Sequence, residues 1–486
     1  MTPQDYRRLD ALDLATLVAR REVSATEVTE AAIASIEALN PTLNAVVLRR
    51  FEAARAEAAH LDAEGPGHRP LAGVPFLLKD VNLYAADMPT RFASRFFADA
   101  SPRGDSTLVQ RWRGAGLVTL GKSNTPEFAG DFVTEPRLYG PCLNPWDRGV
   151  TVGGSSGGAA VAVASGMVPL AHGTDLGGSI RIPAACCGVV GFKPSVGLNP
   201  LGPHWEEIAS GLDSDHVLSR TVRDSAAALD ATAGPDTGTR LGRLPPQGGY
   251  LAGLDAAGPR LRIGVATADP GGRRAGPSQV EAAERTARLL EGLGHHLEPY
   301  AFPPEAQPEA WFDSLWAVDV VVLVEERARE IGRQPRPDEL EPYLWAALDH
   351  ARGLSAADWL RARLAMTRAA VAVLGSMEHL DVILSPTLGE DPPALGVLAF
   401  EANGSDLATW SARGYAFAPF VAAANLSGQP AASLPVMVND RGLPVGVQVA
   451  ARPGEDLLLL RLAREVESAT DWQASLAALQ DRLATA

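Results

Sequence analysis

Two loops in which glycines flank a serine constrain this chain more than any other feature of its sequence. The first is Gly153-Gly154-Ser155-Ser156-Gly157-Gly158, and the second is Gly177-Gly178-Ser179-Ile180-Arg181. Glycine takes positive φ and lets the backbone turn tightly, so such a loop can direct several N–H groups at one oxygen atom. Donors fixed in this way stabilise negative charge as it develops on that oxygen. The loops therefore predict a site that binds an oxyanion.

Short apolar segments alternate with helical ones along the chain, which predicts an α/β fold with a helical insertion in the C-terminal half. Ser24 and Glu27 match a capping box, and we expect Pro41 to end the helix that follows. The segments that read as strands are 74–78, 117–120, 168–171, 188–192, 261–266, 382–384 and 445–449. The first of them places Lys79 at the end of a buried strand.

The overall composition narrows the class of protein. A formal net charge of -15 argues against a nucleic-acid-binding surface, which is normally basic. Cys142, Cys186 and Cys187 are too few for a disulfide framework, so we expect a reducing, cytoplasmic setting and small packing residues. We find no signal-peptide pattern and no apolar run of about 18 residues, so no membrane span is expected.

Three other interpretations of the glycine loops are weaker. Nucleotide binding would need Lys and Ser or Thr directly after the last glycine, as in a Walker loop, and neither loop has them. Gly153–Gly157 satisfies the G-x-S-x-G pattern of a nucleophile elbow, but turn-like residues precede it instead of a hydrophobic strand. Glycine-rich turns without chemistry remain the third interpretation, which a strand-end lysine and a second loop disfavour.

Taken together, Lys79, the first loop and Gly173–Ala184 resemble the amidase signature family, whose members use a Ser-Ser-Lys triad. The spacing of Ser155 and Ser179 is also that of the family. Further similar segments are 121–128, 144–147, 191–194, 425–430 and 442–448. The resemblance implies a single large domain over 1–486 with a mixed central sheet covered by helices on both faces. It places core motifs in 70–230, a variable, mostly helical substrate-side region in 235–380, and a return to the core in 381–486.

The resemblance also implies roles for individual residues. Ser179 would be the acylated nucleophile, Ser155 the bridging serine next to a cis peptide bond, and Lys79 the terminal base. Lysine has a reference pKa of about 10.4, so Lys79 can act as a base near neutral pH only if burial lowers that pKa. The backbone N–H groups of Leu176, Gly177, Gly178 and Ser179 would form the oxyanion hole.

Residues around this core receive secondary interpretations. Gly130 and Phe132 would line the acyl side of the substrate pocket, by analogy with the family. We expect Asp175 and Arg181 to hold the Ser179 loop by hydrogen bonds, and Lys122 to lie in a surface turn. The aromatic residues Trp311, Trp316, Tyr343 and Trp345 are expected mainly in the core. No metal and no cofactor is expected.

The expected substrate is a small or oligomeric amide, linear or cyclic. Residues 134–141 and 179–188 are similar to the group that includes 6-aminohexanoate cyclic dimer hydrolase. Carbamates, esters and aryl amides remain alternatives within the family. So does a role as the amidase subunit of an amidotransferase, although Thr125 and Pro126 depart from the pattern of those subunits. No nucleic-acid or membrane partner is expected, and a homodimer is compatible with the sequence.

Overall fold

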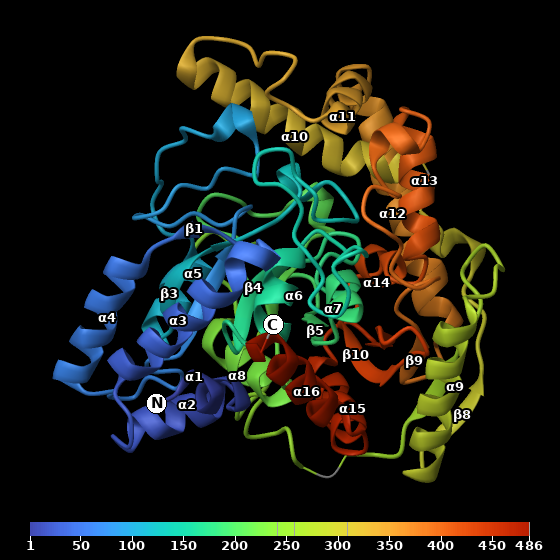
Figure 1. Ribbon diagram of the computed structural model, residues 1–486. Helices are drawn as coiled ribbons and strands as arrows, with labels where there is room; N and C mark the ends of the chain where they lie inside the picture. Colours follow the sequence, from blue (N-terminus) through green and yellow to red (C-terminus); the bar gives the residue numbers. More distant parts are fainter. Residues whose placement is uncertain (241, 257, 309, 486) are drawn as a thin grey trace.

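The strands form two sheets in the computed structural model, which describes residues 1–486 apart from Leu241, Ala257, Glu309 and Ala486 (Figure 1). The larger sheet has the order β4-β6-β5-β10-β11-β9-β7-β8, and the smaller has the order β1-β3-β2. The strands are β1 Val46–Arg49, β2 Pro75–Lys79, β3 Val118–Ser123, β4 Leu170–Thr174, β5 Val190–Lys193, β6 Asp215–Ser219, β7 Arg262–Val265, β8 His296–Pro299, β9 Val382–Pro386, β10 Ala431–Val438 and β11 Pro444–Ala451. The predicted α/β class and mixed sheet are confirmed, and the three-stranded sheet is an addition to the prediction.

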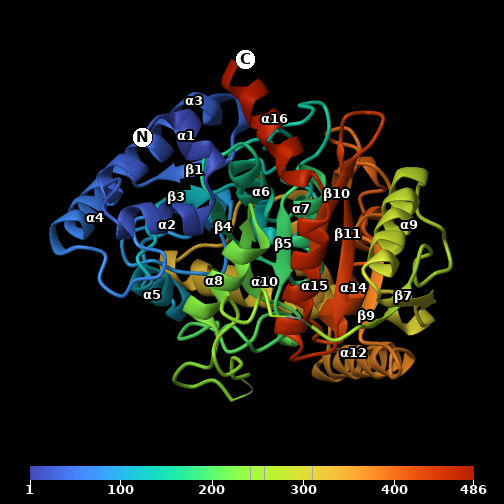
Figure 2. The same cartoon turned by 90° about the horizontal axis from the view of Figure 1, so that it is seen from below.

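Helices pack against both faces of the larger sheet (Figure 2). The helices are α1 Pro3–Arg8, α2 Ala11–Ala19, α3 Ala25–Leu43, α4 Phe51–Glu64, α5 Thr107–Gly114, α6 Gly157–Ala164, α7 Arg181–Cys187, α8 Val222–Thr232, α9 Pro277–Gly292, α10 Ala310–Ile331, α11 Pro342–Arg352, α12 Ala356–Ser376, α13 Leu407–Phe417, α14 Ala422–Leu426, α15 Asp456–Ser468 and α16 Trp472–Thr485. Side chains along β11 alternate between the two faces of the sheet, and each face packs against helices. Val447 and Val449 enter the core formed with α8, α9 and α15. Gly446 faces α7, where a Cβ would lie 3.0 Å from the Cβ of Ala185.

Helix α6 joins the two sheets. Every residue of α6 is buried, and the helix contacts β2 and β3 of the smaller sheet as well as β4 of the larger one. Its alanines and valines are small enough to pack in this narrow space. Consequently the loop that precedes α6 lies between the end of β2 and the end of β4, which is where the predicted site residues come together.

Two local predictions are wrong, and both fail for tertiary reasons. Pro41 lies inside α3, which continues to Leu43, because a proline in the last turn removes only one helical hydrogen bond. Lys122 lies in β3 and not in a surface turn, because β3 pairs through Gly121, Lys122 and Ser123 with both β1 and β2. The strands β1, β6, β8 and β10 were not predicted.

Helices α10, α11 and α13 lie together at the top of the molecule in Figure 1, over the loops that carry the site. They come from the region predicted to be mostly helical and from the segment just after it. Aromatic side chains of these helices pack on one another, with the rings of Tyr343 and Trp410 stacked at 5.0 Å. Among the helices that the structure describes, none combines the length and apolar character needed to cross a membrane.

Candidate active site

Lys79 ends β2 with its side chain fully buried. Its Nζ contacts three hydroxyl oxygens, at 2.7 Å from Ser155 Oγ, 3.0 Å from Ser156 Oγ and 2.8 Å from Thr174 Oγ1. Burial lowers the pKa of the Lys79 amine to about 7, although the carboxylates of Asp213, Asp215 and Asp175 act in the opposite direction. The amine is therefore available as a neutral base near physiological pH.

Ser155 is buried in the loop before α6, and the peptide bond that joins it to Gly154 is cis. The loop lies directly against the segment 131–134. A Cβ on Gly154 would come within 2.7 Å of the backbone nitrogen and oxygen of Val133, so only glycine fits there. This close packing directs the Ser155 hydroxyl toward Lys79.

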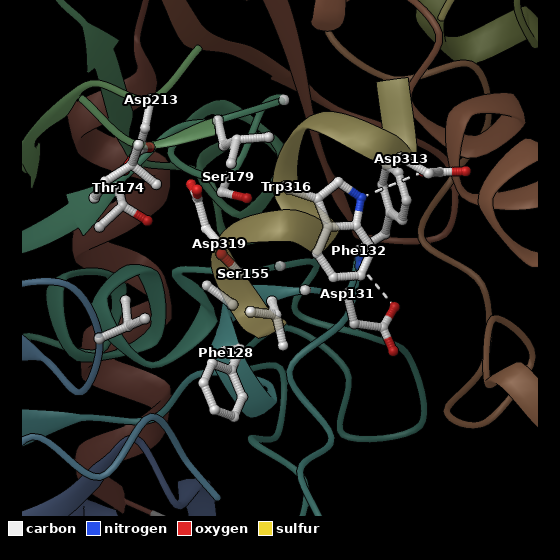
Figure 3. Close-up of a pocket in the computed structure, with 18 of the residues that line it drawn as sticks. Phe128, Asp131, Phe132, Ser155, Thr174, Ser179, Asp213, Asp313, Trp316 and Asp319 are labelled. Carbon is white, nitrogen blue, oxygen red and sulfur yellow. Dashed lines mark hydrogen bonds between the residues drawn. The ribbon is translucent and has the colours of Figure 1, made fainter. Parts of the chain in front are cut away.

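Ser179 follows β4 in the second glycine loop and lines the pocket described below (Figure 3). Its side chain is half-buried, whereas Ser155 is fully buried. The two loops are tied together, because the backbone N–H of Ser156 donates to the carbonyl of Ser179 at 3.1 Å. Both serines line the pocket, but Ser179 is the more exposed of the two, and Ser155 is the one that contacts the lysine.

A buried ion pair shapes the Ser179 loop. Arg181 donates to both carboxylate oxygens of Asp175, at 2.9 and 2.8 Å, and also to Asn425 and Gln448 from the C-terminal part of the chain. Burial raises the pKa of Asp175, but Arg181, Lys193 and Asn425 more than offset this and hold it at about 2. Asp175 in turn accepts the N–H groups of Gly178 and Ile180. These contacts agree with the loop-holding role expected for Asp175 and Arg181.

One of the four backbone donors predicted for the oxyanion hole already has a partner in the protein. The N–H of Gly178 donates to Asp175 Oδ1 at 2.8 Å, so it is not free to bind a substrate oxygen. The backbone N–H groups of Leu176, Gly177 and Ser179 have no acceptor within the described part of the chain. The candidate set is therefore these three, and Gly178 instead supplies the turn, with φ of 114°.

Lys122 is a second buried lysine near Lys79. It lies 3.5 Å from Asp80 and donates to Thr90 Oγ1 at 2.5 Å. Burial lowers its pKa to about 8. Because an acidic partner neutralises it and because it is absent from the residues that line the pocket, its contacts are those of a structural ion pair.

A pocket opens in front of Ser179 and encloses about 880 Å³, a volume that includes its open mouth. Gly130 and Phe132 both line it, and Phe132 packs edge-on against Tyr415 at 4.9 Å. Trp316 lines it as well, whereas Trp311, Tyr343 and Trp345 do not. Three of the four aromatic residues expected in the core therefore lie outside the pocket, and Trp316 is the exception.

Several site residues escaped the sequence analysis. Ser156 and Thr174 contact Lys79. Both lie in the family motifs described above, but no role was assigned to them from the sequence. The carboxylates of Asp131, Asp213, Asp313 and Asp319 line the pocket. They come from separate loops and from α10, and no local pattern brings them together. Within the described residues, no group of three or more His, Cys, Asp or Glu side chains is placed to hold a metal ion.

The fold and this arrangement define an amide hydrolase, and the chain belongs to the amidase signature family: residues 27–460 match the Amidase family. It is 36% identical to the 6-aminohexanoate-cyclic-dimer hydrolase of Paenarthrobacter ureafaciens, over 96% of this chain and 95% of that protein. It is 34% identical to the acylamidase of Rhodococcus erythropolis, over 97% and 98% of the two chains. A solved structure of 6-aminohexanoate cyclic dimer hydrolase complexed with substrate superposes with a TM-score of 0.91 at 34% identity, covering 98% of this chain and 99% of that chain.

Proposed function

We propose that the chain hydrolyses amides with Ser179 as nucleophile, Ser155 as proton relay and Lys79 as terminal base. One observation carries the proposal: Lys79 Nζ lies 2.7 Å from the buried Ser155 Oγ, and the adjoining loop presents half-buried Ser179 to the pocket. A lysine with its pKa near 7 and two successive hydroxyls supply a base and a nucleophile without histidine.

The hydroxyl contacts indicate how the proton travels. The Ser156 hydroxyl donates to the carbonyl of Thr174 at 3.3 Å, so its oxygen accepts from Lys79. A neutral lysine has two N–H groups and one lone pair. With its N–H groups donated to Ser156 Oγ and to Thr174 Oγ1 at 2.8 Å, the lone pair is open to the proton of Ser155. Ser155 passes its proton to Lys79 as it accepts the proton of Ser179. The freed Ser179 oxygen attacks the carbonyl carbon of the substrate.

The remaining steps follow from the same groups. Attack forms a tetrahedral intermediate, whose oxyanion accepts hydrogen bonds from the N–H groups of Leu176, Gly177 and Ser179. As the carbon–nitrogen bond breaks, the relay returns its proton to the leaving amine, and the acyl group stays on Ser179. Water then attacks the acyl carbon while Ser155 and Lys79 again take its proton. The relay returns that proton to the Ser179 oxygen as the bond between this oxygen and the acyl carbon breaks, which releases the acid.

For the substrate, we propose small or oligomeric amides, linear or cyclic. The 36% identity to a 6-aminohexanoate-cyclic-dimer hydrolase over nearly the whole chain supports this choice. Carbamates, esters and aryl amides are the alternatives that the same chemistry allows. We further propose that the chain works in the cytoplasm without an obligatory partner, as a monomer or homodimer. The buried, unpaired state of Cys142, Cys186 and Cys187 supports a reducing compartment.

A panel assay with the purified chain tests the proposal. Aliphatic, aryl and cyclic amides, including the cyclic dimer of 6-aminohexanoate, are compared with carbamates and esters, each with wild type and with Ser179→Ala. We expect wild type to hydrolyse amides and Ser179→Ala to lose at least about 10³-fold in kcat with an unchanged thermal unfolding midpoint. Normal activity in Ser179→Ala would exclude it as nucleophile. An inert wild type that gains activity only with a second protein would favour the amidotransferase alternative.

A further inference from the structure

The pocket in front of Ser179 combines acidic and aromatic side chains. Its carboxylates are Asp131, Asp213, Asp313 and Asp319, and its aromatic rings are Phe92, Phe128, Phe132, Phe312, Trp316, Trp410 and Tyr415. Among the described residues that line the pocket there is no Lys, Arg or His. Buried carboxylates are normally paired with a cation, because removing a charge from water is costly. The carboxyl groups of the pocket therefore have no cationic side chain beside them among the lining residues.

Asp213 has hydrogen-bonding capacity that the described part of the protein does not satisfy. The residue is 5% exposed and lines the pocket, and its Oδ2 accepts from Asn82 Nδ2 at 2.7 Å. Its Oδ1 is buried and has no hydrogen-bond partner in the described part of the chain. An unpartnered carboxylate oxygen at a pocket wall is suited to a ligand that carries hydrogen-bond donors.

Helix α10 supplies two of the pocket's carboxyl groups and an indole ring between them in sequence. Asp313, Trp316 and Asp319 lie at successive intervals of three residues along its pocket face. One oxygen of Asp319 accepts the N–H of Ala209 at 2.6 Å, and one oxygen of Asp313 accepts from Ser411 Oγ at 2.9 Å. Within the described structure, the second oxygen of each carboxylate has no hydrogen-bond donor. Figure 3 shows the Asp319 carboxylate extending from α10 toward the side of the pocket that carries Ser179 and Thr174.

We propose that the substrate carries an alkylammonium group, which binds to Asp319 beside the ring of Trp316 while the scissile amide reaches Ser179. An ammonium group attracts both a carboxylate and the face of an indole ring, and the two contacts reinforce each other where water is excluded. The proposal rests on the proposed amide hydrolysis and names the class of amide.

The protonation states of the carboxylates agree with this assignment. Burial raises the pKa of Asp313 and of Asp319 to about 6, so both are ionised at neutral pH. Burial raises the pKa of Asp131 and of Asp213 well above the ordinary range, which disfavours a negative charge on these two side chains. Asp319 is therefore an ionised partner for a cation on the α10 wall, while Asp313 is held by Ser411 and by the indole N–H of Trp316.

Two pairs of isosteric amides test the proposal. In the first pair, 6-aminohexanamide is compared with heptanamide, where a methyl replaces the ammonium on the acyl side. In the second, N-acetyl-1,6-diaminohexane is compared with N-heptylacetamide, which moves the difference to the amine side. We expect wild type to favour the cationic member of at least one pair by tenfold or more in kcat/KM.

Asp319→Asn and Glu326→Gln make a matched pair of charge-removing variants on α10. Asparagine keeps an oxygen that can accept the Ala209 N–H, and Glu326 is exposed and outside the pocket. We expect the cationic preference, measured as the ratio of kcat/KM for the two members of a pair, to fall at least fivefold in Asp319→Asn and to persist in Glu326→Gln. Equal or better hydrolysis of the neutral member in both pairs would overturn the proposal and leave the amidase function intact.

Binding to Ser179→Ala separates the two proposals, since it needs no turnover. Calorimetry compares both members of each pair with this variant and with Ser179→Ala/Asp319→Asn. We expect the cationic member to bind at least tenfold more tightly to Ser179→Ala and to lose that advantage in the double variant. Equal affinity for the charged and neutral members would overturn the proposal even if wild type hydrolysed none of the four amides.

Discussion

In the proposed mechanism, Lys79 is the residue on which the chemistry depends. Its charge state is set by two opposing effects, namely burial, which favours the neutral amine, and nearby carboxylates, which favour the ammonium. Burial has the larger effect and brings the pKa to about 7. Above that pH the amine is mostly neutral and can accept the Ser155 proton, whereas below it the amine is protonated and the relay stops.

The pH profile tests this directly. We expect kcat/KM to rise with pH and to level off above an apparent pKa of about 7, because Lys79 must lose its proton to act as base. Burial raises the pKa of Asp215 to the same range, so Asp215→Asn is the control. If the rise reports the deprotonation of Lys79, it persists in this variant and moves to lower pH. The reason is that the substitution removes the Asp215 carboxylate, which raises the pKa of Lys79. Loss of the rise in Asp215→Asn would assign it to the carboxyl group.

Gly178 carries a second prediction at this scale. Its φ is 114°, and a Cβ would lie 2.4 Å from Val421 Cγ2, so Gly178→Ala strains the backbone and overpacks the core at once. We expect a loss of about 3 kcal/mol in the free energy of unfolding, measured by chemical denaturation. Gly177→Ala is the matched control, because its Cβ would meet Phe312 Cζ at an ordinary 3.5 Å. Equal stability of the two variants would contradict the assigned loop geometry.

At the scale of the elements, sequence patterns predicted the strands that are locally apolar. The run 74–78 correctly placed Lys79 at the end of β2, and the capping box correctly began α3. β3 was cut short, because Gly121-Lys122-Ser123 is polar and turn-like by itself and becomes a strand only through pairing on both sides. The place of Asp313 and Asp319 of α10 in the pocket was not predicted for a similar reason, since it depends on which loops this helix faces in the folded protein.

The extension of β3 buries Lys122, which leads to a prediction about stability. Replacing Lys122 with methionine leaves Asp80 without its cation 3.5 Å away, while hydrogen bonds from Arg91 N–H and Tyr139 remain. We expect Lys122→Met to lower the free energy of unfolding by about 3 kcal/mol, measured in urea. Lys122→Met/Asp80→Asn should recover part of that loss. A change below about 1 kcal/mol in the single variant would mean that the ion pair is not needed for stability.

At the scale of the whole molecule, distant parts of the chain build one site. Lys79 comes from the smaller sheet, Ser179 follows a strand of the larger one, and Asn425 and Gln448 near the C-terminal end hold Arg181 in place. The pocket wall comes from α10 and α13. We propose on this basis that residues 1–486 fold as one unit.

Unfolding experiments can check that proposal. Far-ultraviolet circular dichroism and tryptophan fluorescence should report one coincident transition on heating or in urea, because the core contacts link both sheets through α6. Asn425→Ala should shift both signals together. Two separated transitions would show that parts of the chain unfold independently.

The most direct test of the central claim is to locate the acyl group. Wild type, Ser155→Ala and Ser179→Ala are mixed with the p-nitrophenyl ester of hexanoate, quenched in acid and mapped by peptide mass spectrometry. We predict one hexanoyl group on Ser179 in wild type, slower formation of the same adduct in Ser155→Ala, and none in Ser179→Ala. An acyl group on Ser155, or an adduct that persists in Ser179→Ala, would contradict the assignment of nucleophile and relay.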